Sequence, residues 1–261
     1  MIKIDDVCQF MDQRAPRRLA EGWDNVGLLV GDRNAALTKV LTCLTVTPES
    51  VREAVEGNYQ LVISHHPFPF KGMKKITFDT INGQMLHELI ANKIAVYSSH
   101  TAFDSTLGGI NEMILRELSI DEPNPIQLNL DQKTGSGRIG KPAKTRTVSQ
   151  IINDLKSLTG ASEVRLVGSP DDTPKKIAVG CGSGGDFLDK AMALGCGCFI
   201  TGEMSFHSLL AAKARNVSVI LLGHYSSEKF AMNLLAKEID QHFEDIEALP
   251  SLIERDPLTT H

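Results

Sequence analysis

Two stretches of the chain share one pattern of hydrophobic and polar positions. Residues 40–64 read VLTCLTVTPESVREAVEGNYQLVIS, and residues 177–201 read IAVGCGSGGDFLDKAMALGCGCFIT. Each begins with an apolar run, continues through a polar turn and an amphipathic segment, and ends in a second apolar run. Short apolar runs on both sides of a segment with helical spacing predict strand, helix, strand. Each stretch is therefore expected to form a βαβ unit, which is right-handed in nearly all proteins.

The repeat continues beyond these stretches. The first is followed by a helix-like QMLHELIANK, an apolar IAVYSS and His100, and the second by SLLAAKARN, VSVILLG and His224. The longer first half is explained by a polar insertion at residues 71–83. In both halves the histidine precedes a carboxylate by four positions, giving His100 with Asp104 and His224 with Glu228. Further helices are expected over residues 109–118 and 227–243.

We therefore expect an α/β protein of two similar lobes, residues 1–129 and 130–261, with mostly parallel strands. The segment between them, residues 121–137, is rich in Pro, Asn, Asp and Gly and lacks helical periodicity, which is typical of a linker. A helix over residues 4–19 is expected to precede the first lobe. The last residues, 253–261, are expected to be frayed.

Composition narrows the class of protein. The 261 residues are 42% hydrophobic and 23% charged, as in ordinary globular proteins. The net charge of −5 argues against indiscriminate binding to nucleic acid, which needs clustered positive charge. The chain has no apolar run of the ~20 residues that span a bilayer. Its beginning, MIKIDDVCQF, does not resemble a signal peptide, so a cytoplasmic location is expected.

The five cysteines are sparse and lack zinc-finger spacing, which favours reduced thiols. Cys196 and Cys198 alternate along a predicted strand. Packing inside a sheet is therefore a better interpretation of this pair than metal binding.

Five of the eight histidines fall at or just after predicted strand ends: His65, His66, His100, His207 and His224. In open α/β sheets, ligand sites lie beyond the carboxyl ends of the strands. Imidazole and carboxylate groups are ligands for Zn, Fe, Co, Ni and Mn.

The two His-x3-carboxylate pairs and His65-His66 supply four imidazoles and two carboxylates. This set suits two divalent ions per chain better than one. In the alternative interpretation, Ser226 or Ser227 caps the last helix and Glu228 interacts with the helix dipole.

Other polar positions are candidates for the same site. Glu203 and His207 occupy the place in the second half that His65-His66 occupy in the first, and they are candidates for hydrogen-bonding partners of the ligands, acid/base groups or lid contacts. The segment 180–185, GCGSGG, is either a tight turn or a cradle for phosphate. Asp24 and Asn25 lie in a polar loop that is a further candidate for lining the site.

As a set and in this order, six motifs resemble the NIF-three family: WDNVGLLVGD, ISHHPF, YSSHTAFD, GGIN, TGEMSFH and GHYSSEKF. Its members are often described as GTP cyclohydrolase type two homologues or dinuclear-metal-centre proteins. The resemblance implies two α/β lobes with a two-metal site in the cleft between them, toroidal homo-oligomers that are commonly hexamers, and here a short form without an inserted domain. It implies these metal ligands: His65, His66, Asp104, His224 and Glu228. His100 would line or complete the site.

One departure concerns Thr45, where many members carry Asp; Thr47 is a possible substitute hydroxyl. Two functions follow from the resemblance and the residues. The first is a metal-dependent hydrolase, GTP cyclohydrolase-like or a phosphoesterase, acting on a small nucleotide-like substrate, with His100, Glu203 or His207 moving protons. The second is a non-enzymatic metal-containing ring that serves as scaffold, regulator or single-strand nucleic-acid binder. One Trp and three Tyr offer little base stacking for that role.

Overall fold

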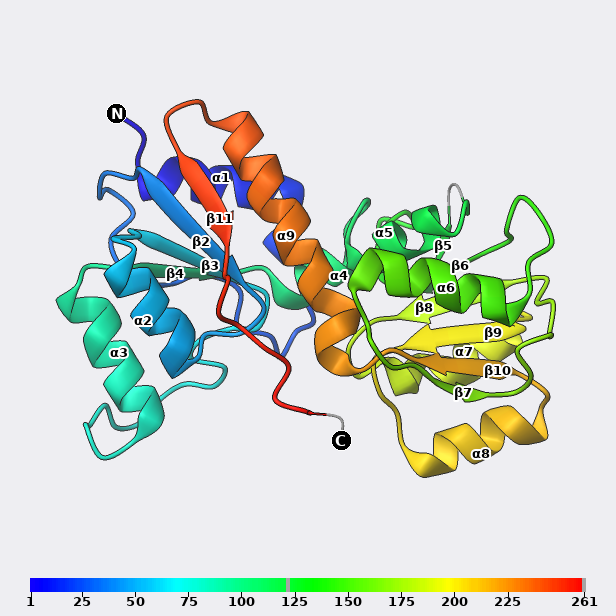
Figure 1. Ribbon diagram of the computed structural model, residues 1–261. Helices are drawn as coiled ribbons and strands as arrows, with labels where there is room; N and C mark the ends of the chain where they lie inside the picture. Colours follow the sequence, from blue (N-terminus) through cyan, green and yellow to red (C-terminus); the bar gives the residue numbers. More distant parts are fainter. Residues whose placement is uncertain (121–122, 260–261) are drawn as a thin grey trace. The chain divides into compact units, whose positions relative to one another are not determined.

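The computed structural model describes residues 1–120 and 123–259 and divides the chain into two α/β units (Figure 1). Unit 1 comprises Met1–Phe103 and Ala231–His261, and unit 2 comprises Asp104–Phe230. The α/β class is as expected, but these units differ from the two halves on either side of residue 129. The chain leaves unit 1 within α4 (His100–Ser105) and returns to it within α9 (His224–His242).

Unit 1 contains a five-stranded sheet in the order β1-β4-β3-β2-β11. The strands are β1 (Gly27–Val30), β2 (Lys39–Cys43), β3 (Leu61–Ser64), β4 (Ala95–Ser98) and β11 (Glu247–Pro250). All neighbours pair in parallel except β1, which is antiparallel to β4. With α2 (Pro48–Glu56) between β2 and β3, the strand–helix–strand unit predicted over residues 40–64 is confirmed.

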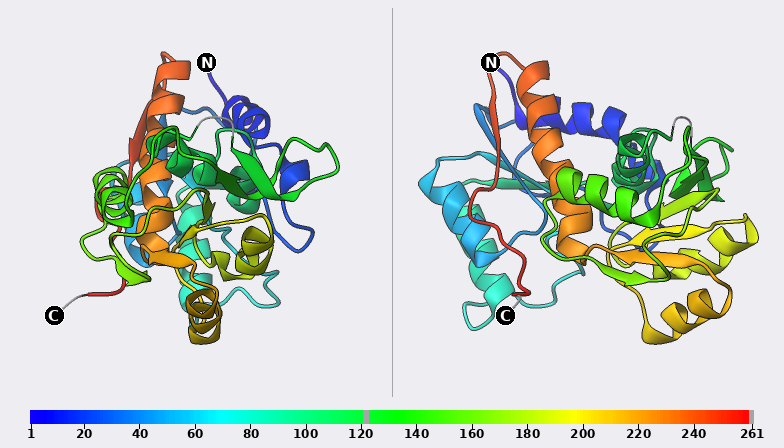
Figure 2. Two further views of the ribbon diagram at one scale, coloured as in Figure 1. Left: turned by 90° about the vertical axis from the view of Figure 1, so that its right-hand side faces the viewer. Right: turned by 45° about the vertical axis from the view of Figure 1, so that its right-hand side comes forward.

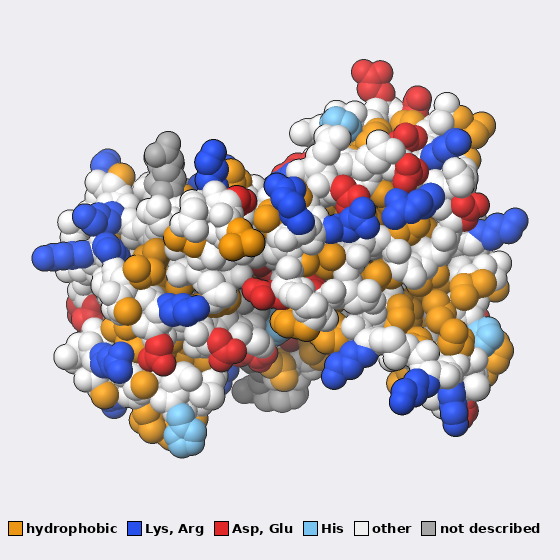
Figure 3. Space-filling model, turned by 180° about the vertical axis from the view of Figure 1, so that it is seen from behind, with side chains coloured by type: hydrophobic (Ala, Val, Ile, Leu, Met, Phe, Trp, Pro, Cys, Tyr) orange, Lys and Arg blue, Asp and Glu red, His pale blue; other side chains and the backbone are white. Residues whose placement is uncertain are grey.

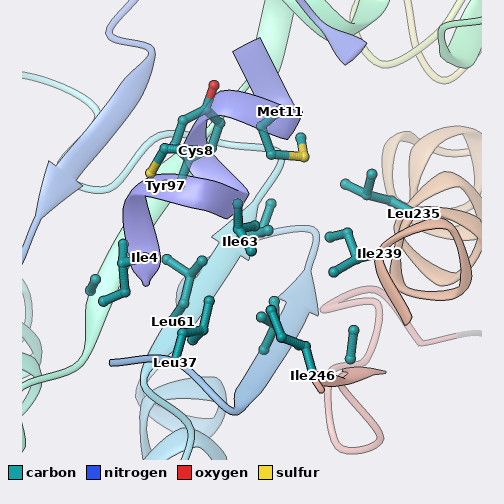
Figure 4. Packing of buried hydrophobic residues seen from close by; sticks show 14 of the residues in the cluster. Ile4, Cys8, Met11, Leu37, Leu61, Ile63, Tyr97, Leu235, Ile239 and Ile246 are labelled. Atoms are coloured by element: carbon teal, nitrogen blue, oxygen red, sulfur yellow. The ribbon is translucent and has the colours of Figure 1, made fainter. Parts of the chain in front are cut away.

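Helices cover both faces of this sheet (Figure 1). On one face α1 (Ile4–Arg14) and the C-terminal part of α9 bury Ile4, Met11, Leu235 and Ile239 against β2, β3 and β4, as Figure 4 shows. On the other face α2 and α3 (Ile81–Ala91) pack against the same strands. The helix expected over residues 4–19 ends at Arg14, and a separate 3-10 turn, η1, follows at Arg17–Leu19.

The start of α2 gives Thr47 a structural role. Its hydroxyl accepts a hydrogen bond from the backbone N–H of Ser50 at 3.2 Å, and Pro48 occupies the first helical position. Both features are typical of helix N-termini. Thr47 therefore caps a helix and does not replace the missing carboxylate at position 45.

The C-terminal segment adds a strand to the sheet of unit 1, and Glu254 beyond that strand is hydrogen-bonded to the chain. β11 pairs with β2, and the carboxylate of Glu254 accepts the backbone N–H groups of Leu44 and Thr45 at 2.9 and 2.8 Å. Figure 2 shows this red segment running along unit 1. The expectation of a frayed segment over residues 253–261 is therefore wrong at Glu254, which is buried and hydrogen-bonded; residues 260 and 261 lie outside the described part.

Unit 2 contains a six-stranded sheet in the order β5-β6-β8-β9-β10-β7. The strands are β5 (Asn124–Leu128), β6 (Gly135–Gly140), β7 (Arg165–Val167), β8 (Ile177–Gly180), β9 (Cys198–Thr201) and β10 (Ser218–Leu221). Strands β8, β9 and β10 are parallel to one another, and the others pair antiparallel. The segment expected to be a linker thus supplies two strands; Asp121 and Glu122, which begin it, lie outside the described residues.

The sheet of unit 2 also has helices on both faces (Figure 1). α7 (Leu188–Ala193), preceded by the 3-10 turn η2 (Gly184–Phe187), and α8 (Phe206–Ala214) pack on one face, and α5 (Ile110–Glu117) and α6 (Val148–Thr159) cover the other. Cys196 and Cys198 are buried, and the Cys196 thiol donates to the Cys198 carbonyl at 3.0 Å, in agreement with sheet packing. No helix in the described residues combines the length and apolar character needed to cross a membrane.

Arg138 on β6 is the largest fully buried side chain of the described residues. Its guanidinium donates to the carbonyls of Ser105 and Thr106 at 3.0 and 2.9 Å and to two carbonyls of its own strand. Its Nε lies 3.5 Å from a carboxylate oxygen of Glu112. Burial lowers the pKa of Arg138, and the charge of Glu112 opposes that shift. Arg138 thereby fixes the chain directly after α4.

We predict that Arg138→Ala lowers the free energy of unfolding of unit 2 by about 3–5 kcal/mol, because it removes a buried positive charge beside the Glu112 carboxylate and the donor to several buried carbonyls. Urea unfolding followed by circular dichroism measures this loss. Arg116→Ala is the matched control, since Arg116 pairs with the same Glu112 at 2.6 Å from an exposed position and its loss is expected to cost less than about 1 kcal/mol. Equal losses in the two variants would contradict the role given to Arg138.

Candidate metal centre

Strand register brings the predicted ligands of unit 1 to one edge of its sheet. Cys43 on β2 lies opposite Ser64 on β3, which in turn lies opposite Ser98 on β4. The residues that follow these three positions leave the sheet together at its carboxyl edge. His65 and His66 come directly after β3, and His100 follows β4 by two residues. The edge is therefore the place at which parallel α/β sheets bind ligands.

The three imidazoles of unit 1 form a cluster that could hold a metal ion. His65, His66 and His100 each offer a ring nitrogen, and these nitrogens lie within 4.8 Å of one another. The ring centroids are 5.1, 5.2 and 5.5 Å apart. Neutral imidazole nitrogen is a good donor to divalent first-row transition ions, so the residues present fit such an ion.

A buried carboxylate orients one of these rings. Asp24 Oδ1 lies 2.8 Å from His100 Nδ1, and its second oxygen accepts the backbone N–H of Thr101 and the Thr101 hydroxyl at 3.1 and 2.5 Å. Burial raises the pKa of Asp24, but these hydrogen bonds outweigh it and hold the pKa below its usual value. Carboxylate–histidine pairs of this kind fix the ring and leave the other nitrogen, Nε2, for a ligand.

A hydroxyl performs the same task for His66. Thr45 Oγ1 lies 2.7 Å from His66 Nδ1. Thr45 is the position at which the resemblance implies Asp. The threonine therefore still contacts a candidate ligand, although it brings no negative charge.

His100 also has an unusual backbone. Its φ is +28°, a value that side-chain-bearing residues rarely adopt, and its N–H donates to the carbonyl of His65 at 3.2 Å. Such conformations are strained and gather at functional sites, where the surroundings enforce them. The contact with Asp24 and the bond to His65 both hold His100 in this position.

Unit 2 has an equivalent edge. Gly180 on β8 lies opposite Thr201 on β9, and Thr201 lies opposite Leu221 on β10. The residues beyond them include Gly182, Glu203 and His224. His224 is the first residue of α9, which places Glu228 one helical turn later on the same face.

The imidazole of His224 lies between two carboxylates. Its Nε2 is 3.1 Å from Glu228 Oε2, and its Nδ1 is 2.9 Å from Glu203 Oε1. Ser183 donates to the same oxygen of Glu203 at 2.7 Å. The hydrogen bond with Glu228, assisted by Glu203 and opposed by burial, raises the pKa of His224 to about 9. The hydrogen bonds from His224 and Ser183 lower the pKa of Glu203.

The Gly-rich turn is shaped by Glu228. Gly182 has a φ of +58°, and a Cβ at this position would lie 2.3 Å from Glu228 Oε1 and 3.2 Å from His224 Nε2. Only glycine allows the turn to come this close to the two side chains.

Three backbone amides of the Gly-rich turn donate hydrogen bonds to side chains of the protein. The N–H groups of residues 181, 182 and 184 donate to Asn111, Ser227 and Thr201. These contacts favour a tight turn over a phosphate cradle. Ser227 lies inside α9, whose first residue is His224, so the capping alternative for this serine was wrong.

Asp104 is held by residues that the ligand prediction did not include. The thiol of Cys181 donates to Asp104 Oδ1 at 3.3 Å, and the Asn111 amide donates to the Asp104 carbonyl at 3.2 Å. Burial, followed by the charges of Asp104 and Glu228, raises the pKa of Cys181 well above its usual value. Sequence reasoning set aside the cysteines because they lack metal-site spacing. The GGIN motif pointed to Asn111, but without a role for it.

Glu203 and His207, the two candidates from the second half of the chain, have different surroundings. Glu203 reaches His224 and also borders a pocket of about 450 Å³ lined by Ser183, Gly185, Asp186, Met204, Ser205 and Ser208. His207 lies exposed on the first turn of α8, and its ring contacts Phe206. Asp24 contacts a candidate ligand directly, as described above, and Asn25 donates to the carbonyl of Pro69 at 3.0 Å.

Comparison with known proteins decides the family. The family described as Duf34/NIF3 (NGG1p interacting factor 3) matches residues 2–257. The chain belongs to the Duf34/NIF3 family. The resemblance carried by the six motifs is thereby confirmed over nearly the whole chain.

Relatives in the Duf34/NIF3 family cover the full chain. A GTP cyclohydrolase 1 type 2 homolog of Clostridium perfringens is 35% identical over 98% of both chains. The NIF3-like protein 1 of Drosophila melanogaster is 33% identical over 99% of this chain and 89% of its own length. The crystal structure of Staphylococcus aureus protein SA1388 has a TM-score of 0.88 at 28% identity and covers 100% of this chain and 99% of its own.

We predict that His224 of the metal-free protein titrates near pH 9 when followed by NMR of labelled histidines. Because this pKa lies above the ordinary value of 6.5, the stabilisation by protonated His224 is complete below pH 6.5 and is lost as the pH rises towards 9.

The variant Glu228→Gln tests the cause of this shift. It removes the main hydrogen-bonding carboxylate, so the midpoint is expected to fall towards 6.5, and further than in Glu203→Gln. A midpoint below 7 in the unaltered protein would contradict the contacts described for His224.

Proposed function

We propose that this protein is a metal-dependent hydrolase that acts on a small, nucleotide-like substrate. Its two divalent ions per chain are held by His65, His66, Asp104, His224 and Glu228. The observation that carries the proposal is the cluster of three imidazoles at the sheet edge of unit 1, with a carboxylate or hydroxyl behind two of them. Metal-ligating histidines almost always have their second ring nitrogen hydrogen-bonded in this way.

The proposed ligands are imidazole nitrogens and carboxylate oxygens, which favour divalent first-row transition ions. Imidazole and carboxylate donors suit Zn, Fe, Mn, Co and Ni, and we propose an ion of this group. When bound, divalent ions activate water as a nucleophile and neutralise negative charge that develops on the substrate. The carboxylates of Asp104 and Glu228 offset part of the ions' positive charge.

We propose that protein groups beside the ligands move protons. The contact with Asp24 occupies Nδ1 of His100, which leaves Nε2 to bind an ion or exchange a proton. Glu203 has a side chain 54% exposed and touches His224, so it can exchange a proton with solvent and with a neighbouring substrate. His207 remains a candidate acid or base on sequence grounds.

The names of the relatives support the substrate class. Several are called GTP cyclohydrolase 1 type 2 homolog, which points to a purine nucleotide. The alternative, a ring that binds single-stranded nucleic acid, is less well supported. Figure 3 shows acidic and basic side chains interspersed on the face that it presents, and the net charge is −5. The hexameric ring and the cytoplasmic location implied by the resemblance stay predictions.

We predict about two first-row transition ions per chain in the purified protein, measured by elemental analysis. His66→Ala and Glu228→Gln are expected to lower this number, because each removes a donor. His87→Gln is the matched control, since His87 on α3 stacks on Phe78 and its loss is expected to leave the metal content unchanged. A native protein that takes up no ion from Zn, Mn or Fe(II) would refute the metal centre.

Turnover tests the hydrolase itself. Hydrolysis of nucleotides and simple phosphoesters is expected to stop on chelation, to return with the ion, and to fall with metal content in His66→Ala and Glu228→Gln. His87→Gln again serves as control. If both ligand variants keep full turnover of every substrate, the proposed site is wrong.

We predict that Asp24→Asn weakens metal binding about 10–100-fold, because the amide no longer holds His100 as a carboxylate does. Competition with a coloured chelator measures the affinity. The buried contacts from Thr101 can still form, so the fold is expected to persist, and circular dichroism checks this. Unchanged affinity in a folded variant would show that the Asp24–His100 pair does not support an ion.

A further inference from the structure

Two large aromatic side chains stand exposed beside the histidine cluster of unit 1. Trp23 is 64% exposed and Phe70 is 48% exposed. Their ring centroids lie 6.2 Å apart with planes tilted by 38°. Each ring lies in a T-shaped arrangement with the His100 ring. The ring centroids are 5.9 Å apart in both cases, and the interplanar angles are 75° for Trp23 and 70° for Phe70. Large aromatic rings that are exposed next to one another are typical of binding surfaces.

Hydrogen bonds on both sides of Trp23 hold it in place. The N–H of Glu21 donates to the Thr101 hydroxyl at 2.9 Å, and Asp24 binds both His100 and Thr101. The N–H of Asp24 also donates to the carbonyl of Glu21 at 2.9 Å, which closes the turn that carries Trp23. These bonds fix the backbone that carries the exposed Trp23 ring relative to His100.

Phe70 is tied to the same turn. The side-chain amide of Asn25 donates to the carbonyl of Pro69, the residue before Phe70, at 3.0 Å. The two aromatic residues, 47 positions apart in the sequence, are thus connected by one hydrogen bond between their loops. Surfaces organised before binding lose little conformational entropy when a ligand arrives.

Positive charge follows Phe70 in the chain. The segment directly after it reads KGMKK, and Lys71, Lys74 and Lys75 are all exposed. Three exposed lysines within five residues of Phe70 favour a ligand that is both planar and anionic. Planar rings stack on aromatic side chains, and the ammonium groups attract phosphate.

We propose that Trp23 and Phe70 form a stacking surface for the base of a free mononucleotide, with the lysines after Phe70 attracting its phosphate. This assignment rests on the proposed function, for which it names the ring-binding part of the site. The stacked ring lies next to His100, so the surface selects substrates that carry a planar heteroaromatic ring. Trp23 and Phe70 determine specificity and bind no ion.

Trp23 is the only tryptophan of the chain, so its fluorescence reports directly on this surface. We expect guanosine 5′-monophosphate to quench it in a saturable manner, both with and without metal. Ribose 5-phosphate, which has the phosphate and sugar but no base, is expected to cause no comparable quenching. Equal effects of the two compounds would overturn the proposal.

Variants separate stacking from metal binding. Phe70→Leu is expected to weaken guanosine monophosphate binding about tenfold while the metal content stays that of the native protein. Phe78→Leu is the matched control, because Phe78 is 65% exposed in the same unit and stacks on His87 instead. Isothermal titration calorimetry provides the affinity for Trp23→Leu, which no longer carries the fluorophore. Unchanged affinity in both Trp23→Leu and Phe70→Leu would refute the surface.

The outcomes also distinguish this inference from the function on which it rests. Base-dependent quenching without metal uptake or turnover would sustain the stacking surface and remove the hydrolase. Metal-dependent hydrolysis of simple phosphoesters without base-dependent quenching would do the reverse. A single-stranded oligonucleotide that binds more tightly than the mononucleotide in 200 mM salt would overturn the choice of a free mononucleotide as ligand.

Discussion

The alignment of parallel strands is the constraint on which the candidate site depends. In unit 1 the pairing of Ser64 with Ser98 makes two chain segments leave the sheet at the same edge. In unit 2 the pairings of Gly180, Thr201 and Leu221 do the same for three segments. A shift of one residue in either register would turn every following side chain to the opposite face. The three histidines of unit 1 are near one another because the backbone hydrogen bonds of its sheet fix where each strand ends.

The carboxyl edges of the two sheets hold polar and charged side chains that a hydrophobic protein interior would exclude. The carboxylate of Asp24 is buried against His100, and His224 sits between Glu203 and Glu228. A charged carboxylate is costly to bury unless it is paired, and the buried carboxylates of Asp24 and Glu228 each contact an imidazole. Apolar packing on both faces of each sheet supplies the rigid support that holds them, and Arg138 fixes the chain directly after α4. Local strain at His100 fits the same view, since a site can hold a strained residue only where the surrounding contacts are strong.

Residues around the ligands divide the work between them. Asp24, Thr45 and Glu203 each contact one candidate imidazole, and Gly182 leaves room for the carboxylate of Glu228. Trp23 belongs to the same turn as Asp24, so the turn that positions this carboxylate also exposes the indole ring. The WDN sequence therefore joins the support of a ligand, the aromatic surface and the link to the loop of Phe70. One short loop serves three tasks through three adjacent side chains.

The sequence by itself determined the α/β class, the repeated strand–helix–strand units, the family and the types of residue at the strand ends. These follow from local periodicity and from motifs that are contiguous in the chain. Tertiary structure alone decided the division into units, since α9 returns the chain to unit 1 and β11 pairs with a strand that lies more than 200 residues earlier in the chain. It also decided that Cys181 contacts Asp104, that Thr45 and not Thr47 meets His66, and that Trp23 lies beside Phe70. Each of these contacts joins residues that are far apart in the chain. Local patterns in the sequence do not show which of them meet, because only the folded chain brings their atoms within hydrogen-bonding or stacking distance.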